Sequence, residues 1–138
     1  AEWWGDSLPL IVDLIADMQK EYRIDEHRIY VTGLSMGGFG TWDLLGRHPE
    51  LFAAAAPICG GGDPATCNKF PKVPIWVFHG DADKVVRPEQ SRRMVEALKK
   101  AGGTPKYTEY PGVGHDSWSQ TYADAAFMEW LFSQKRTP

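Results

Sequence analysis

The fold is decided by residues 28–48, which read RIYVTGLSMGGFGTWDLLGRH. The apolar residues at 28–32 predict a strand, and the apolar periodicity of 36–47 predicts an amphipathic helix that ends before Pro49. The GLSMG elbow at 33–37 joins the two and places one serine in a strained, exposed turn. We interpret Ser35 as an activated nucleophile, the alternative being an ordinary glycine-rich turn.

The residues beside Ser35 fit the same interpretation. We expect Gly33 and Gly37 to be glycines because strand and helix approach too closely there for side chains. The backbone N–H of Met36 then faces the oxyanion that forms when the serine attacks a carbonyl, and the dipole of the helix supports it. These expectations concern local geometry alone.

The remaining chain alternates between strands and helices. Helices are predicted at 8–22, 36–47, 88–101 and 120–133, with the first capped near Asp6 or Ser7. Strands are predicted at 28–32, 52–58, 74–79 and 106–110. This order predicts an α/β fold in which helices cover both faces of a parallel sheet, in one domain spanning residues 1–138. Ligands of such sheets bind beyond the carboxyl ends of the strands.

The composition excludes several classes of function. The chain has 138 residues, of which 43% are hydrophobic and 24% charged, with a formal net charge of -3. We therefore expect neither a nucleic-acid partner nor binding to an anionic membrane. No apolar run approaches the roughly 20 residues of a transmembrane helix, and the first residues do not resemble a signal peptide.

Two cysteines lie in the short loop CGGGDPATC at 59–67. A disulfide between Cys59 and Cys67 is slightly favoured over two independent thiols, and it would indicate a secreted or periplasmic protein. The loop contains no histidine and no second cysteine pair, so its spacing does not match a zinc site.

A base and an acid are found after the later predicted strands. His115, in PGVGHDSW, follows the last strand and can serve as general base, although it can also be read as a loop histidine that caps the closing helix. The HGDAD segment at 79–83 offers Asp81 and Asp83 as the acid that orients the histidine. His79 is expected to hold a loop by hydrogen bonding. Trp118 is a candidate for the wall of a substrate pocket, and His27 and His48 have weaker claims to a role.

With these motifs the chain resembles the C-terminal half of an α/β-hydrolase esterase. The similarity is greatest to bacterial phospholipase/carboxylesterases and to feruloyl-esterase-like and polyhydroxybutyrate-depolymerase-like esterases. It is carried by 28–63, by VPIWVFHGDADKVVRPEQSRRMVEALKKAGG at 73–103 and by YPGVGHDSW at 110–118. The resemblance implies that Ser35 is the nucleophile, Asp83 the acid and His115 the base. It implies no metal and no organic cofactor.

The chain departs from the family pattern at its front. The family fold has more strands than the four predicted here, and no HGG-type segment precedes Ser35 to supply a second oxyanion N–H. We therefore expect only the C-terminal strands and helices of the fold to be present, with an N-terminal fragment as the partner that completes it. The alternative is a naturally small hydrolase that builds its oxyanion hole differently.

The expected function is hydrolysis of carboxylic esters through an acyl-enzyme, with a small-molecule or polysaccharide-linked ester as substrate. A peptidase of the same fold is an alternative because the same three side chains can cleave amides. A binding module that retained the fold without catalysis is a further alternative, although such a module has no need for all three residues.

Overall fold

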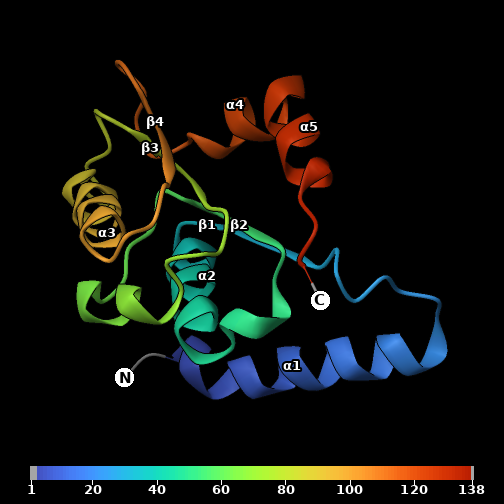
Figure 1. Ribbon diagram of the computed structural model, residues 1–138. Coiled ribbons are helices and arrows are strands. Elements are labelled where there is room, and N and C mark those ends of the chain that lie inside the picture. The colour runs from blue at the N-terminus through green and yellow to red at the C-terminus, as the bar shows by residue number, and fades with distance from the viewer. Residues whose placement is uncertain (1–2, 138) are drawn as a thin grey trace.

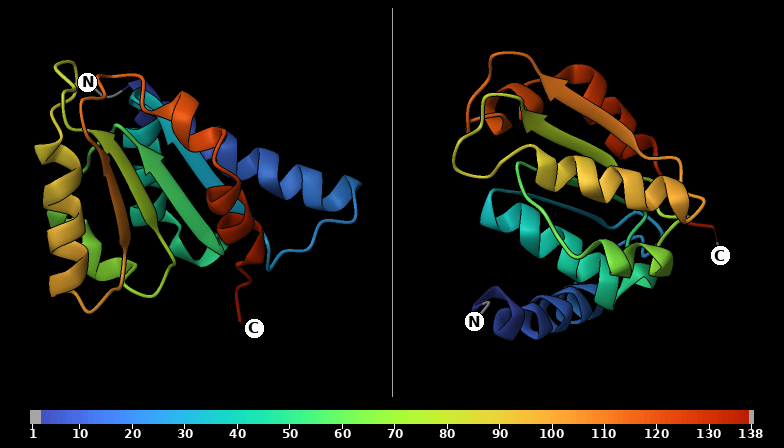
Figure 2. Two further views of the ribbon diagram at one scale, coloured as in Figure 1. Left: turned by 90° about the horizontal axis from the view of Figure 1, so that it is seen from above. Right: turned by 90° about the vertical axis from the view of Figure 1, so that its left-hand side faces the viewer.

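The computed structural model describes residues 3–137 of the chain, with side chains from Gly5 onward. Its elements, in chain order, are α1 (Trp3–Glu21), β1 (Tyr30–Leu34), α2 (Met36–Arg47), η1 (Pro49–Leu51), β2 (Ala54–Ile58), η2 (Pro64–Lys69), β3 (Trp76–Gly80), α3 (Glu89–Lys100), β4 (Lys106–Tyr110), α4 (Trp118–Tyr122) and α5 (Ala125–Ser133). The four strands, labelled in Figure 1, form one parallel sheet in the order β1-β2-β3-β4, which the left view of Figure 2 shows. The predicted fold class is confirmed.

Helices cover both faces of the sheet, as the two views of Figure 2 show. Strand β2 is buried along its whole length, and its side chains alternate between two cores. Ala55 packs with side chains of α2 and α3, whereas Ala54 and Ala56 pack with α5. Because both faces are buried, β2 reads as a continuous apolar run, which is typical of a parallel sheet. None of the helices among the described residues is long and apolar enough to span a membrane.

Helix α1 begins earlier than predicted, at Trp3 instead of residue 8, and contains Pro9 within its length. Proline has no N–H, so the carbonyl of Gly5, one turn earlier, loses its intrahelical donor. The Arg47 side chain from α2 donates to that carbonyl at 3.3 Å. A contact with another helix therefore compensates for the missing backbone bond, and the sequence of α1 alone could not reveal it.

The closing helix predicted at 120–133 is two helices, α4 and α5. The break lies at Asp124, whose carboxylate accepts a hydrogen bond from the backbone N–H of Ala126 at 2.9 Å. Asp124 is thus the N-cap of α5, with extended backbone geometry that interrupts the helix. The apolar periodicity continues across the break, which is why the sequence predicted one element.

Candidate active site

Ser35 lies in the elbow between β1 and α2 with φ 53° and ψ -117°, in a backbone region that residues other than glycine rarely adopt. A Cβ atom at Gly33 would lie 2.3 Å from the carbonyl oxygen of Gly37, so a side chain at Gly33 is excluded as expected. The expectation for Gly37 is wrong, because a Cβ there would meet nothing within 4 Å.

A second close approach, between Gly38 and Gly60, leaves no room for a side chain at either residue. A Cβ atom at Gly38 would lie 2.7 Å from the Ile58 carbonyl oxygen, and one at Gly60 would lie 2.6 Å from the Gly38 carbonyl carbon. The first turn of α2 therefore rests directly on the backbone that leaves β2. Gly60 comes from a different segment, so the elbow motif by itself could not identify this contact.

Three side chains from distant parts of the sequence form one hydrogen-bonded chain at the carboxyl ends of the strands. His115 Nε2 lies 2.9 Å from Ser35 Oγ, and His115 Nδ1 lies 2.8 Å from Asp83 Oδ2. Ser35 follows β1, Asp83 follows β3 and His115 lies in the loop after β4. The structure thus brings together the nucleophile, acid and base candidates named from the sequence.

Asp83 is the acid that reaches the histidine. Its other oxygen, Oδ1, accepts hydrogen bonds from the backbone N–H groups of Val85 and Val86, each at 2.9 Å. Burial opposes ionisation of this carboxyl group, but the hydrogen bonds from His115, Val86 and Val85 outweigh it and lower the pKa of Asp83. An ionised Asp83 can only accept, so Nδ1 of His115 carries the proton and Nε2 is free to accept from Ser35.

The neighbouring Asp81 has a different role. Its carboxylate accepts a hydrogen bond from the N–H of Gly112 at 2.7 Å and so ties the loop after β3 to the loop that carries His115. The local sequence did not distinguish Asp81 from Asp83 as the acid. In the structure, Asp83 is the one that contacts His115.

His79 holds the loop after β3, as expected. Its Nε2 lies 2.7 Å from the Val86 carbonyl oxygen, and its Nδ1 lies 2.6 Å from Ser91 Oγ. The carbonyl can only accept, so Nε2 bears the proton and Nδ1 accepts from the serine. Burial lowers the pKa of His79 and keeps the ring neutral. Val86 also donates to Asp83, so His79 supports the acid through the same loop.

The N-terminus of α2 faces the site. Met36 is the first residue of this helix, and helix geometry leaves its N–H without an intrahelical acceptor. This is the donor expected for the oxyanion. Trp118, the first residue of α4, sets its ring edge-on to His115, with centroids 5.4 Å apart and planes at 86°. Trp118 therefore contacts the candidate base, and its place in a pocket wall stays a prediction.

The disulfide expectation is wrong in this structure, where Cys59 and Cys67 are both free and buried. The Cys67 thiol donates to the Met94 carbonyl oxygen at 3.8 Å, within the core beneath α3. Cys59 instead lies below the elbow, and its sulfur accepts a hydrogen bond from the Ser35 N–H at 3.2 Å. Cys59 adopts φ 44°, and burial raises the pKa of its thiol.

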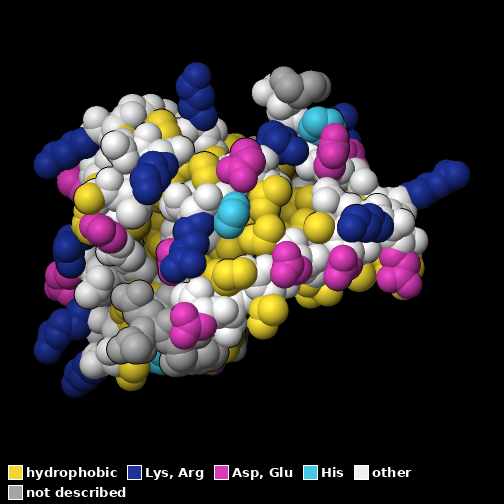
Figure 3. Space-filling view, turned by 90° about the horizontal axis from the view of Figure 1, so that it is seen from below, with side chains coloured by type: hydrophobic (Ala, Val, Ile, Leu, Met, Phe, Trp, Pro, Cys, Tyr) yellow, Lys and Arg dark blue, Asp and Glu magenta, His cyan; other side chains and the backbone are white. Residues whose placement is uncertain are grey.

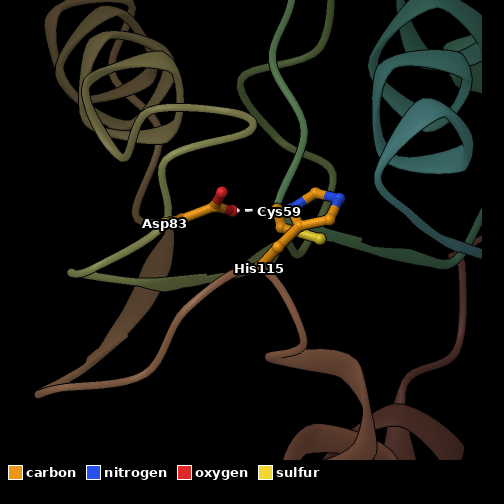
Figure 4. Close-up of side chains that lie close together, drawn as sticks. All are labelled: Cys59, Asp83 and His115. Atoms are coloured by element: carbon orange, nitrogen blue, oxygen red, sulfur yellow. Dashed lines mark hydrogen bonds and ion pairs between the residues drawn. The ribbon is translucent and has the colours of Figure 1, made fainter.

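Cys59 is the site residue that the sequence argument missed. It follows β2 directly, at the same sheet edge as the other candidates, so the strand-end rule could have found it. Figure 4 shows its sulfur next to the His115 imidazole, with the Asp83 carboxylate across the ring from it in this view. One ligand atom from each of these residues lies within 4.8 Å of the other two, and this set of donors could hold a metal ion.

A parallel sheet with helices on both faces, a serine in a strand-to-helix elbow and the chain order Ser, Asp, His define an α/β-hydrolase. Comparison with known proteins gives the family. Residues 7–128 match the dienelactone hydrolase family, and the chain belongs to it.

Similar proteins include several esterases. The chain is 30% identical to poly(3-hydroxyalkanoate) depolymerase C of Paucimonas lemoignei over 79% of its own length and 31% of the relative's. It is 37% identical to the bifunctional acetylxylan esterase/xylanase XynS20E of Neocallimastix patriciarum, over 73% of this chain and 16% of that protein. The crystal structure of a thermostable esterase matches with a TM-score of 0.92 and 47% identity, covering 95% of this chain and 37% of that one. The chain thus spans between 16% and 37% of the length of these proteins.

Proposed function

We propose that this chain carries the catalytic residues of a serine esterase. The observation that carries the proposal is the hydrogen-bonded chain from Ser35 through His115 to Asp83, with the nucleophile on a strained elbow. The names of the similar proteins support ester hydrolysis as the reaction. The chain needs no cofactor for this chemistry, because nucleophile, base and acid are all side chains.

In the proposed reaction, Ser35 Oγ attacks the ester carbonyl carbon while His115 Nε2 takes its proton. The negative charge on the carbonyl oxygen is stabilised by the Met36 N–H at the positive end of α2. The protonated His115 then gives its proton to the departing alkoxide, which leaves an acyl group on Ser35. Water, deprotonated by Nε2, attacks this acyl-enzyme and releases the acid and free serine. Asp83 holds the ring and stabilises its positive charge throughout.

We propose an acyl group attached to a carbohydrate as the natural substrate, with small esters as further substrates. The acetylxylan esterase relative supports this choice, as does a 34% identical endo-1,4-beta-xylanase/feruloyl esterase of Xylanibacter ruminicola. An acetylated xylo-oligosaccharide and methyl ferulate, compared with nitrophenyl acetate and a peptide amide, discriminate the possibilities. Preferential cleavage of the peptide amide would favour a peptidase instead.

The test of catalysis is covalent labelling of the intact protein with a fluorophosphonate, together with nitrophenyl ester hydrolysis. Ser35→Ala is expected to abolish labelling and to lower kcat by at least about 10³-fold, because the attacking group is gone. Ser133→Ala is the matched control, since Ser133 lies in the last turn of α5 and donates to the Trp130 carbonyl oxygen. Equal labelling of the wild type and Ser35→Ala would contradict the assignment.

We further propose that an N-terminal segment of the same fold covers the edge of β1 and the outer side of α1. Among the described residues β1 pairs only with β2, which leaves its other edge open. A groove of about 500 Å³ runs beside it, lined by apolar residues that include Leu8, Ile11 and Leu44. Leu10 and Leu14 on α1 are 66% and 58% exposed, and Figure 3 views this side of the molecule with its hydrophobic side chains in yellow. The greater length of the relatives supports a covering segment.

A further inference from the structure

Cys59, Asp83 and His115 form a set of ligands that the proposed reaction uses only in part. Their donor atoms, Sγ, a carboxylate oxygen and an imidazole nitrogen, lie within 4.8 Å of one another. Thiolate, imidazole and carboxylate are the three ligand types that Zn²⁺ takes in proteins. We propose that these residues bind a thiophilic divalent cation of the Zn²⁺ class, and that this cation reversibly inhibits the enzyme. The inhibition rests on the proposed esterase function, whereas the binding does not.

The distance between the His115 and Asp83 donor atoms fits such an ion after a small movement. His115 Nδ1 and Asp83 Oδ2 are 2.8 Å apart. Two ligands of a tetrahedral zinc, each at roughly 2.0–2.2 Å from the metal, are separated by about 3.4 Å. The ion therefore replaces the proton between them and opens the pair by about half an ångström. Cys59 Sγ lies within 4.8 Å of the other two donor atoms, and the His115 side chain is 22% exposed.

The surroundings already orient the ligands. Asp83 Oδ1 is held by the N–H groups of Val85 and Val86, which leaves Oδ2 directed at the site. Ser117 provides an independent indication, because its hydroxyl is completely buried and has no hydrogen-bond partner among the described residues. This hydroxyl lies beside the Cys59 thiol, whose pKa is raised, chiefly by burial. A metal-bound thiolate would accept the Ser117 proton and satisfy that group.

The proton balance explains why binding inhibits. Cys59 Sγ gives up its proton to solvent, and the metal ion takes the place of the proton on His115 Nδ1. The ring stays neutral because it carries a proton on Nε2 instead of Nδ1, so one proton, that of Cys59, is released in total. Nε2 then donates and no longer accepts, so it cannot deprotonate Ser35, which lies 2.9 Å away. The charges of thiolate and carboxylate neutralise the divalent ion, so the buried site holds no net charge.

The test uses the intact protein, first freed of metals with a chelator. Co²⁺ is added as a spectroscopic probe, and Zn²⁺ is titrated into a nitrophenyl ester assay. We expect a thiolate-to-cobalt charge-transfer band, displaced by Zn²⁺, and inhibition by Zn²⁺ that a chelator reverses. Mg²⁺, which prefers oxygen ligands, should not inhibit.

Variants separate the site from other thiols. Cys59→Ser keeps an acceptor for the Ser35 N–H but removes the soft ligand, so the band should vanish and Zn²⁺ inhibition should weaken by about 100-fold relative to that variant's own activity. Cys67→Ala is the matched control and should keep both, because Cys67 lies in the other core. Ser35→Ala should keep the cobalt band, which distinguishes failed binding from failed catalysis. Equal Zn²⁺ sensitivity in Cys59→Ser and wild type, or cobalt binding without a thiolate band, would overturn the proposal.

Discussion

Ser35, His115 and Asp83 form a chain of hydrogen bonds whose direction is set by the charge at its far end. The lowered pKa of Asp83 keeps it ionised, so it accepts from Nδ1 and leaves Nε2 as an acceptor for the serine. An amide in place of the carboxylate can donate to Nδ1 and stabilise the opposite tautomer. The proposed chemistry therefore depends on a single negative charge that is buried behind the histidine.

Asp83→Asn is expected to lower kcat for a nitrophenyl ester by about 10⁴-fold with little change in KM, because the histidine is held in the wrong tautomer. The matched control is Asp81→Asn, where the amide oxygen can still accept from Gly112 N–H and activity should stay within a few-fold. Steady-state kinetics on both variants decides between the acids. A larger loss of kcat for Asp81→Asn than for Asp83→Asn would contradict the assignment.

Besides the apolar cores, the helices contact the sheet in two further ways, backbone against backbone and charge against charge. At the front of α2, Gly38 lies against the backbone after β2, with no room for a side chain. At the other end of the sheet, Arg92 of α3 pairs with Glu109 of β4 through two hydrogen bonds of 2.8 Å each. The first contact positions the nucleophile, and the second joins α3 to β4 at that end of the sheet.

Gly38→Ala is expected to lower the free energy of unfolding by about 1–3 kcal/mol, since the new Cβ would lie 2.7 Å from the Ile58 carbonyl oxygen. Gly46→Ala, in the same helix, meets Thr66 at an ordinary 3.6 Å and should raise it by about 0.5–1 kcal/mol. Urea unfolding of both variants measures the two changes in the free energy of unfolding, which should have opposite signs. A Gly38→Ala protein as stable as wild type would show that the backbone contact is absent in solution.

The Arg92–Glu109 pair predicts part of the loss of folding stability at acid pH. Hydrogen bonding from Arg92 lowers the pKa of Glu109 below its usual 4.5. A carboxyl group with a depressed pKa in the folded protein stabilises it above the unfolded value, and this contribution is lost as the pH falls through the folded value.

Glu109→Gln should therefore lower stability at neutral pH and show a smaller loss of stability than wild type as the pH falls below 4.5. Because Arg92 and Glu109 are both partly exposed, added salt should reduce the difference. Glu96→Gln on α3 is the control and should follow the wild-type curve. If the stability of Glu109→Gln and of the wild type fell equally with pH in the acid range, a stabilising pair would be contradicted.

The molecule buries its apolar side chains well on one side of the sheet order and leaves many of them exposed on the other. The cores on both faces of the sheet are complete around β2 and β3, whereas β1 and α1 leave apolar groups exposed. A monomeric protein seldom exposes a large contiguous apolar patch without a covering partner. The proposed N-terminal segment accounts for the exposed residues of α1.

Leu14→Glu in the intact protein tests this cover. If the segment packs on α1, the new carboxylate is buried and the free energy of unfolding should fall by about 2–4 kcal/mol. At a truly exposed position the change should stay within about 0.5 kcal/mol. Val85→Glu is the control for exposure, because Val85 is 72% exposed in the loop after β3. Equal, small effects at both positions would argue that α1 faces solvent.

From the amino-acid sequence alone we could predict the order of the four strands, the elbow at Ser35 and the sheet edge where the site lies. These follow from local rules: hydrophobic periodicity defines each element, and parallel strands bring their carboxyl ends to one edge. The three-dimensional packing was needed to show that Asp83 and not Asp81 contacts His115, that Gly38 and Gly60 touch, and that the free Cys59 contacts Ser35. Each of these depends on which atoms of different loops come within a few ångströms. That distance is set by the packing of the whole chain, and neighbouring residues do not encode it.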